Sequence, residues 1–122
     1  NRSWQKGMSS SIQKGIQYCQ EHMPEIDGAM LLVCDQPALS PGVLQNIATA
    51  FDPIQHPIVR SRYREGYGPP VCFATSLFAD LLKMEGDVGA RAVIQKHMEK
   101  CIDIDFPEGD WDIDEASDLV PV

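Results

Sequence analysis

The sequence predicts an α/β domain with a mainly parallel sheet, because short apolar runs alternate with longer segments of helical periodicity. At 122 residues the chain is long enough for one domain with a real core but not for two, so residues 1–122 are expected to form a single domain. Its hydrophobic content of 43% and charged content of 23% are ordinary globular values.

The N-terminal third is predicted to contain one helix and one strand. Apolar residues recur at helical spacing over 8–23, and Ser9 and Ser10 suit the start of a helix. Pro24 ends this pattern. Residues 29–34 (AMLLVC) are a continuous apolar run, which is typical of a strand covered on both faces.

The central third is predicted to add a helix and two strands. Ser40 and Pro41 stand in the cap-then-proline order that opens a helix, and its inner face is apolar. Residues 57–63 (PIVRSRY) alternate in polarity and predict a strand. Residues 64–70 (REGYGPP) indicate a turn-rich loop, and 71–75 (VCFAT) another short strand.

The C-terminal third is predicted to contain two helices and a last strand. The apolar residues of 77–82 mark a third helix, and 89–101 (GARAVIQKHMEKC) a fourth. Residues 101–107 (CIDIDFP) read as a strand. The acidic segment 108–119 then closes the chain, with a short helix from about Glu115.

Charge and composition exclude several classes of partner. The net charge of −8 argues against a nucleic acid polymer and against a membrane surface, although magnesium could still neutralise the phosphates of a single nucleotide. No apolar run is long enough to span a membrane, and no signal peptide opens the sequence. The four cysteines are far apart and suit a reducing compartment, so the expected location is the cytoplasm.

The stretch LLVCDQP (31–37) places a carboxylate where an apolar strand ends. In open α/β sheets ligands bind beyond the carboxyl ends of the strands, so Asp35 could hold Mg²⁺ there, with Pro37 preventing the strand from continuing. The plainer alternative is an aspartate that caps the next turn. A second carboxylate would come from the acidic cluster that includes Asp114, whose alternative reading is a solvated tail with Asp114 as a helix cap.

Five segments, taken in order, resemble the motifs of one family. They are WQKGMSSSIQKGI (4–16), LLVCDQPALS (31–40), GYGPPVCF (66–73), GDVGARAVI (86–94) and WDIDEASDL (111–119). The chain resembles the C-terminal two thirds of a MobA-like nucleotidyltransferase, and within that family the molybdenum cofactor cytidylyltransferase group. The resemblance implies a Rossmann-like three-layer domain of the nucleotide-diphospho-sugar transferase type, truncated at its N-terminus.

The resemblance also implies an activity. A nucleoside monophosphate, with CMP favoured, would move from a nucleoside triphosphate onto a small phosphorylated acceptor such as molybdenum cofactor, releasing pyrophosphate. Asp35 and Asp114 match the catalytic pair that holds the metal, expected to be Mg²⁺. No side-chain nucleophile is required, since positioning and charge stabilisation dominate such transfers.

The remaining motif positions match residues that contact the two substrates. The nucleotide-binding positions are Gly7, Ser10 and Ser11, which could instead cap a helix, and the acceptor-binding positions are Gly68, Pro70 and Arg91. A plain turn would also explain Gly68 and Pro70. Arg91 could meet an acceptor phosphate or pair with Asp87 on a helix surface.

Two departures from the family pattern affect the expected activity. The closing motif has Glu115, Ala116 and Ser117 where the family prefers Thr, Pro and an acid. The family's opening glycine-rich loop and lysine, which cradle the triphosphate, have no counterpart in these 122 residues. We therefore expect no turnover from this chain alone.

Two other functions remain open at this stage. The chain could be a naturally short, non-catalytic module that binds or dimerises, or a small glycosyltransferase-like domain that uses a D-x-D motif. In the implied fold, the strand at 29–34 would lie next to the absent first strand, and its unpaired edge lacks charge and proline. We therefore expect a homodimer, joined through this strand or the apolar surface beside it.

Overall fold

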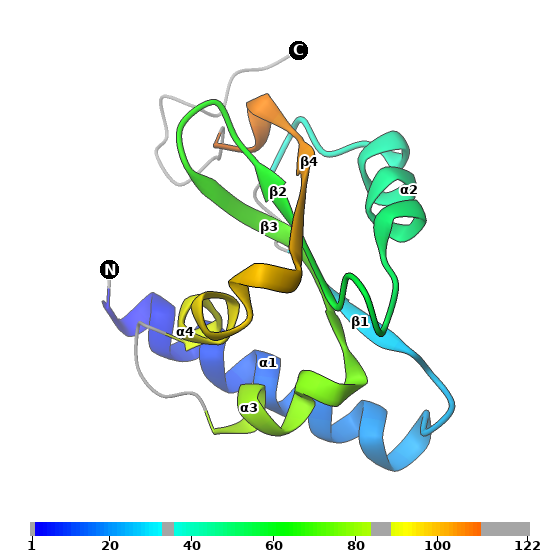
Figure 1. The fold of residues 1–122 in the computed structure, drawn as a ribbon. Coiled ribbons are helices and arrows are strands. Elements are labelled where there is room, and N and C mark those ends of the chain that lie inside the picture. Colours follow the sequence, from blue (N-terminus) through cyan, green and yellow to red (C-terminus); the bar gives the residue numbers. More distant parts are fainter. Residues whose placement is uncertain (1, 33–35, 84–88, 111–122) are drawn as a thin grey trace.

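The computed structural model describes residues 2–32, 36–83 and 89–110, and it shows a sheet between two helical layers (Figure 1). The strands are β1 (Gly28–Leu31), β2 (Ile58–Arg62), β3 (Tyr67–Ala74) and β4 (Cys101–Asp105). The α-helices are α1 (Arg2–His22), α2 (Pro41–Ala50), α3 (Phe78–Leu82) and α4 (Gly89–Lys96). Three short 3₁₀ helices are η1 (Thr75–Leu77), η2 (Met98–Lys100) and η3 (Pro107–Asp110). The predicted α/β class is confirmed.

The four strands follow the order β1-β3-β2-β4. β1, β2 and β4 run in one direction, whereas β3 runs the opposite way between β1 and β2. Among the described strand pairs, only β2–β4 is therefore parallel. Three strands do share one direction, as a mainly parallel sheet implies, but the expectation that most neighbouring strands pair in parallel is wrong. The reason is the short turn from β2 into β3, since a tight connection can only join antiparallel strands.

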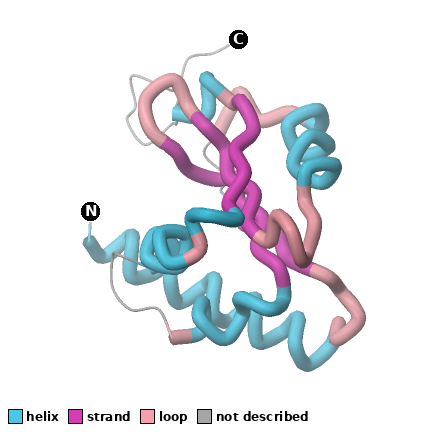
Figure 2. The backbone as a smooth tube through the Cα atoms, viewed as in Figure 1, coloured by secondary structure: helices cyan, strands magenta, loops and turns pink. Residues whose placement is uncertain are grey.

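The sheet buries side chains on both of its faces. In Figure 2 its strands lie between helices. On one face α1, α3 and α4 enclose the larger apolar cluster, made of Ile16, Ile58, Val71, Phe73, Leu77, Phe78, Leu81 and Val93. On the other face α2 covers a smaller cluster, made of Ile47, Val59 and Cys72. Neighbouring strand residues alternate between the two clusters because successive side chains of a strand point to opposite faces.

The first helix is longer than predicted. α1 begins at Arg2, so the predicted start at Ser9 and Ser10 is wrong, whereas the end before Pro24 is confirmed because α1 stops at His22. Residues 2–8 include Arg, Gln, Lys and Met, which are good helix formers. A single glycine, Gly7, costs only about 1 kcal/mol relative to alanine and does not interrupt such a segment.

The predicted loop at 64–70 is wrong in its second half, because β3 begins at Tyr67. The turn into β3 is closed by the Tyr63 backbone N–H donating to the Gly66 carbonyl (2.8 Å), and Gly66 has the positive φ of 90° that favours glycine. The β2–β3 register then shifts, leaving Pro69 and Pro70 between the paired positions, with a cis peptide bond joining them. Prolines lack a backbone N–H, so a bulge accommodates them inside a strand where a regular ladder would not.

The remaining elements follow the sequence more closely. α2 begins at Pro41 with Ser40 as its N-cap residue, and β4 lies within the predicted strand. The fourth helix ends at Lys96 rather than continuing to Cys101, where β4 starts. The helix predicted from about Glu115 lies outside the described residues.

Within the described residues, no helix combines the length and the apolar character needed to cross a lipid bilayer.

Candidate functional site

The carboxyl ends of β1, β2 and β4 lie at one edge of the sheet, because these strands share a direction. The chain continues there into residues 36–39, 63–66 and 106–110, and β3 begins at the same edge with residues 67–70. We call these four segments the carboxyl edge. Ligands of open α/β sheets bind beyond such an edge, which makes it the candidate site.

Gln36 is the polar side chain at the centre of this edge, and it is only 8% exposed. Its Nε2 lies 2.8 Å from the Pro69 carbonyl oxygen, 3.1 Å from the Gly109 carbonyl oxygen and 2.8 Å from the Tyr63 hydroxyl oxygen. Its Oε1 is buried and accepts no hydrogen bond from the described residues. The side chain therefore acts as a donor that connects three segments.

Tyr63 fills the space beside Gln36. Its hydroxyl donates to the Pro69 carbonyl, and its ring meets Phe106 edge-on, with centroids 6.1 Å apart and planes at 80°. A Cβ atom at Gly68 or at Gly109 would overlap the Tyr63 ring. Both glycines therefore make room for one aromatic side chain, which is a role that the local sequence does not reveal.

The carbonyl groups of the β3 bulge are satisfied by side chains. Ser61 is completely buried, and its Oγ donates to the Pro70 carbonyl over 2.8 Å. Pro69 receives its hydrogen bonds from Gln36 and Tyr63. Buried backbone carbonyls need a partner, so the irregular backbone here depends on these three side chains.

Two arginine–aspartate pairs connect β2 and β4 next to this edge. Arg60 Nε lies 2.7 Å from Asp103 Oδ1, and Arg62 Nε lies 3.0 Å from Asp105 Oδ1. The Arg60 guanidinium also lies 3.5 Å from the centroid of the Tyr67 ring. Burial disfavours the Arg60 charge, but the hydrogen bond and charge of Asp103 outweigh it and raise the pKa of Arg60.

These ion pairs distinguish the first D-I-D segment of the sequence, 103–105, from the second, 112–114. Asp103 and Asp105 each form an ion pair with an arginine of β2. The alternation R-S-R in 60–62, facing D-I-D in 103–105, is the sequence signal that could have found the pairing. The second D-I-D, at 112–114, lies outside the described residues.

The structure places only some of the predicted site residues. Asp35 and Asp114 lie outside the described residues. Gly7, Ser10 and Ser11 lie inside α1 and not at its start, so the alternative of simple helix capping is wrong for them.

The predicted acceptor-binding residues lie on two elements. Gly68 and Pro70 belong to β3. Pro70 is fully buried, so its side chain packs inside the protein and is not exposed at the carboxyl edge. Arg91 is exposed on α4, and its predicted partner Asp87 lies outside the described residues. The acceptor-binding roles of these residues stay predictions.

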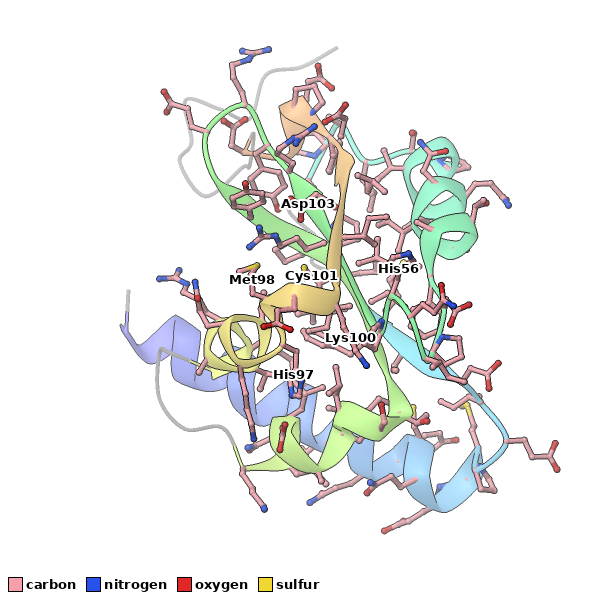
Figure 3. All side chains as sticks on the ribbon, viewed as in Figure 1. His56, His97, Met98, Lys100, Cys101 and Asp103 are labelled. Atoms are coloured by element: carbon pink, nitrogen blue, oxygen red, sulfur yellow. The ribbon has the colours of Figure 1, made fainter. Side chains whose placement is uncertain are left out.

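Across 2–32, 36–83 and 89–110, no group of three or more His, Cys, Asp or Glu side chains could hold a metal. Burial raises the pKa of the Cys72 thiol to about 11, so it is not a thiolate at neutral pH. His97, which follows α4, lies 3.1 Å from Asp80 of α3 and joins two helices at the opposite end of β4 from the carboxyl edge (Figure 3).

The fold is similar to that of solved mycobacterial proteins. A homologue of Mycobacterium tuberculosis Rv0371c from Mycobacterium sp. strain JC1 has a TM-score of 0.67 and 21% identity, covering 87% of this chain and 53% of that one. Rv0371c from Mycobacterium tuberculosis H37Rv has a TM-score of 0.66 and 24% identity, covering 84% and 53%. Its complex with manganese has a TM-score of 0.65 and 24% identity, covering 84% and 55%.

The similarity to these solved structures is limited in length and in sequence identity. The chain spans about half the length of the solved structures that it matches, and identities this low show a shared fold alone. No curated protein matches the chain. The family model described as the MobA-like NTP transferase domain matches residues 1–101, which is most of the sequence. The chain therefore belongs to the MobA-like NTP transferase domain family.

Proposed function

We propose that this chain is the part of a nucleotidyltransferase that binds a metal–nucleotide complex and the acceptor at the carboxyl edge. In the reaction, a phosphate oxygen of the acceptor forms a bond to the α-phosphorus of a nucleoside triphosphate. The bond from that phosphorus to the bridging oxygen breaks, and pyrophosphate leaves with the electron pair. Family membership and the position of the carboxyl edge support this proposal.

One observation supports the proposed metal site most directly. The contact between Gln36 Nε2 and the Gly109 carbonyl, at 3.1 Å, joins the neighbour of Asp35 to a residue five positions before Asp114. Five extended residues span at most about 18 Å, so the closing motif starts within reach of the end of β1. Both acidic segments therefore begin from one small region of the fold.

We propose that Asp35 and Asp114 hold a divalent cation, with Mg²⁺ as the physiological ion. Two carboxylates are hard oxygen donors and suit such an ion, and the solved manganese complex of Rv0371c supports the same class of metal. When bound, the cation supplies positive charge to the phosphate oxygens. The two aspartates would orient it.

The substrate assignments complete the proposal. Gly7, Ser10 and Ser11 would bind the nucleotide, with CTP favoured, and Gly68, Pro70 and Arg91 would face the acceptor, with molybdenum cofactor favoured. The 122 residues contain no glycine-rich loop followed by lysine, so we propose that the chain alone does not turn over and that binding is the informative measurement.

Calorimetric titration of the chain with Mn²⁺, alone and with CTP or GTP, tests the proposed function. Asp35→Asn and Asp114→Asn should each weaken Mn²⁺ binding by about tenfold or more, because each removes a charged ligand. Asp27→Asn is the matched control, since Asp27 is an exposed acid that directly precedes β1, at the opposite end of that strand from the carboxyl edge. Equal Mn²⁺ affinity in all four proteins would show that the metal site is misassigned.

The edge formed by β1 supports a second candidate function, self-association. β1 pairs with β3 alone among the described strands, and its residues 28–31 include neither charge nor proline. Leu32, which follows it, is 47% exposed. The other edge strand, β4, has Asp103 and Asp105, which discourage pairing. We propose that a second copy of the chain covers β1.

Light scattering across a dilution series tests this proposal. Leu32→Lys should shift the chain toward the monomer, because a lysine at an edge opposes strand pairing. Ile54→Lys is the control, since it places the same charge on a residue that is 76% exposed and outside β1. A wild-type chain that stays monomeric at micromolar concentration would contradict a dimer.

A further inference from the structure

We infer that Gln36 is a positioning residue for the proposed site, because its amide locks together the three chain segments that surround the metal–nucleotide complex. The inference rests on the proposed function. Gln36 itself would touch neither the metal nor the substrate. It would act by holding two backbone segments in position, its own segment after β1 and the segment around Gly109 that leads into the closing motif.

The contacts of Gln36 connect parts of the chain that are distant in sequence. Its Nε2 lies within hydrogen-bond distance of residues that are 27, 33 and 73 positions away, namely Tyr63, Pro69 and Gly109, which share its two hydrogens. Tyr63 directly follows β2, Pro69 lies in the β3 bulge, and Gly109 lies in η3, which follows β4. One buried side chain therefore connects the turn after β2, the β3 bulge and the η3 helix that follows β4.

The chemistry of these contacts requires an amide donor. Two of the three acceptors are backbone carbonyl oxygens, and the Tyr63 hydroxyl uses its hydrogen for the Pro69 carbonyl. Exchanging the amide nitrogen and oxygen would place oxygen against oxygen, so the orientation is determined by the network. A glutamate at this position would face the same three oxygens without a donor. The identity of the side chain matters as well as its size.

Among the described residues, every hydrogen bond of this side chain is one that its Nε2 donates. Its Oε1 accepts nothing from the described residues, and the side chain is 8% exposed. A ligand-bearing backbone has to be held close to its productive geometry by buried, hydrogen-bonded neighbours. Gln36 meets that description for the residue before it and, through the Gly109 carbonyl, for the segment that leads into the closing motif.

The test compares two glutamines with Mn²⁺ as the probe. In Gln36→Met the donor is lost at nearly constant volume. Gln13→Met is the matched control, because Gln13 Nε2 donates to the Leu82 carbonyl over 3.0 Å between α1 and α3. Loss of a positioning residue typically weakens metal binding by about 10–100-fold. We expect that loss for Gln36→Met and an unchanged Mn²⁺ affinity for Gln13→Met.

Hydrogen exchange supplies a readout that does not depend on metal. Amide exchange in 36–39, 67–70 and 106–110 should accelerate in Gln36→Met and stay unchanged in Gln13→Met. If Gln36→Met does not fold, Tyr63→Phe replaces it, since it removes the hydroxyl that accepts from Gln36 and donates to Pro69. It should change exchange and Mn²⁺ affinity in the same direction by a smaller factor.

The outcomes separate the two proposals. A wild-type chain that binds no Mn²⁺ refutes the proposed function and this inference with it. If Asp35→Asn weakens Mn²⁺ binding but Gln36→Met does not, the proposed function stands and the positioning role is refuted. Faster exchange in Gln36→Met without loss of Mn²⁺ affinity also refutes it, because Gln36 would then stabilise the edge alone.

Discussion

On the face of the sheet covered by α1, α3 and α4, eight buried side chains without a polar atom form the larger cluster. At the carboxyl edge, by contrast, Ser61, Tyr63 and Gln36 bond the carbonyls of a bulge and of η3. The first region is held by buried apolar area, which is not directional. The second depends on the direction of a few hydrogen bonds and on two glycines beside one ring.

The two regions contribute differently to the protein, one to its stability and the other to its local geometry. Apolar packing contributes most of the free energy of folding but tolerates exchanges of similar volume. A buried hydrogen bond contributes little net stability, yet leaving its partner unsatisfied is costly, so it selects one geometry. We conclude that the face covered by α1, α3 and α4 (the three-helix face) stabilises the domain and that the carboxyl edge defines the shape of the candidate site.

Phe78→Ala should have the largest effect, because it opens a cavity in the apolar cluster of the three-helix face. Phe78 is 2% exposed, and such truncations cost about 3–5 kcal/mol in the free energy of unfolding. Urea titration followed by circular dichroism measures the loss. Ile54→Ala, at an exposed position, is the control and should change little. A loss for Phe78→Ala no greater than this control would contradict the assigned role of that face.

Gly109→Ala should have an intermediate effect, because the new Cβ atom would overlap the Tyr63 ring. Overpacking of this kind costs about 1–3 kcal/mol. Gly15→Ala in α1 is the matched control, because a Cβ atom added there would meet no neighbouring atom within 4 Å and alanine favours helix by about 0.5–1 kcal/mol. The two glycine substitutions should thus change the free energy of unfolding in opposite directions, and a shared sign would refute the packing argument.

Asp80→Asn should have the smallest effect and tests a polar contact between α3 and α4. The hydrogen bond from His97, followed by the charge of Lys96, lowers the pKa of Asp80 below its ordinary value of 3.8 despite partial desolvation. A lowered folded-state pKa stabilises the protein above the ordinary pKa, and this contribution disappears as the pH falls through the folded value.

The free energy of unfolding of wild type and Asp80→Asn should therefore differ most above about pH 5 and converge toward about pH 2. Urea titrations at several pH values measure that difference. A gap that widens on acidification would show the opposite sign of linkage and contradict the assigned contact.

Local patterns in the sequence were enough to predict most of the elements. The spacing of apolar residues predicted α1 and α4, Ser40 and Pro41 predicted the start of α2, and polarity predicted β2 and β4. The start of α1 and the start of β3 were missed. Helix propensity extends α1 through Gly7, and a bulge lets two prolines lie within β3.

The sequence by itself determined the α/β class, the order of the elements and the motifs of the MobA-like family, because periodicity, capping and turn residues act over a few neighbouring positions. Only the tertiary structure decided that β3 lies reversed between β1 and β2, that Asp103 pairs with Arg60, and that Gln36 bonds Gly109. Those contacts join residues tens of positions apart, and which donor meets which carbonyl depends on the register of the assembled sheet.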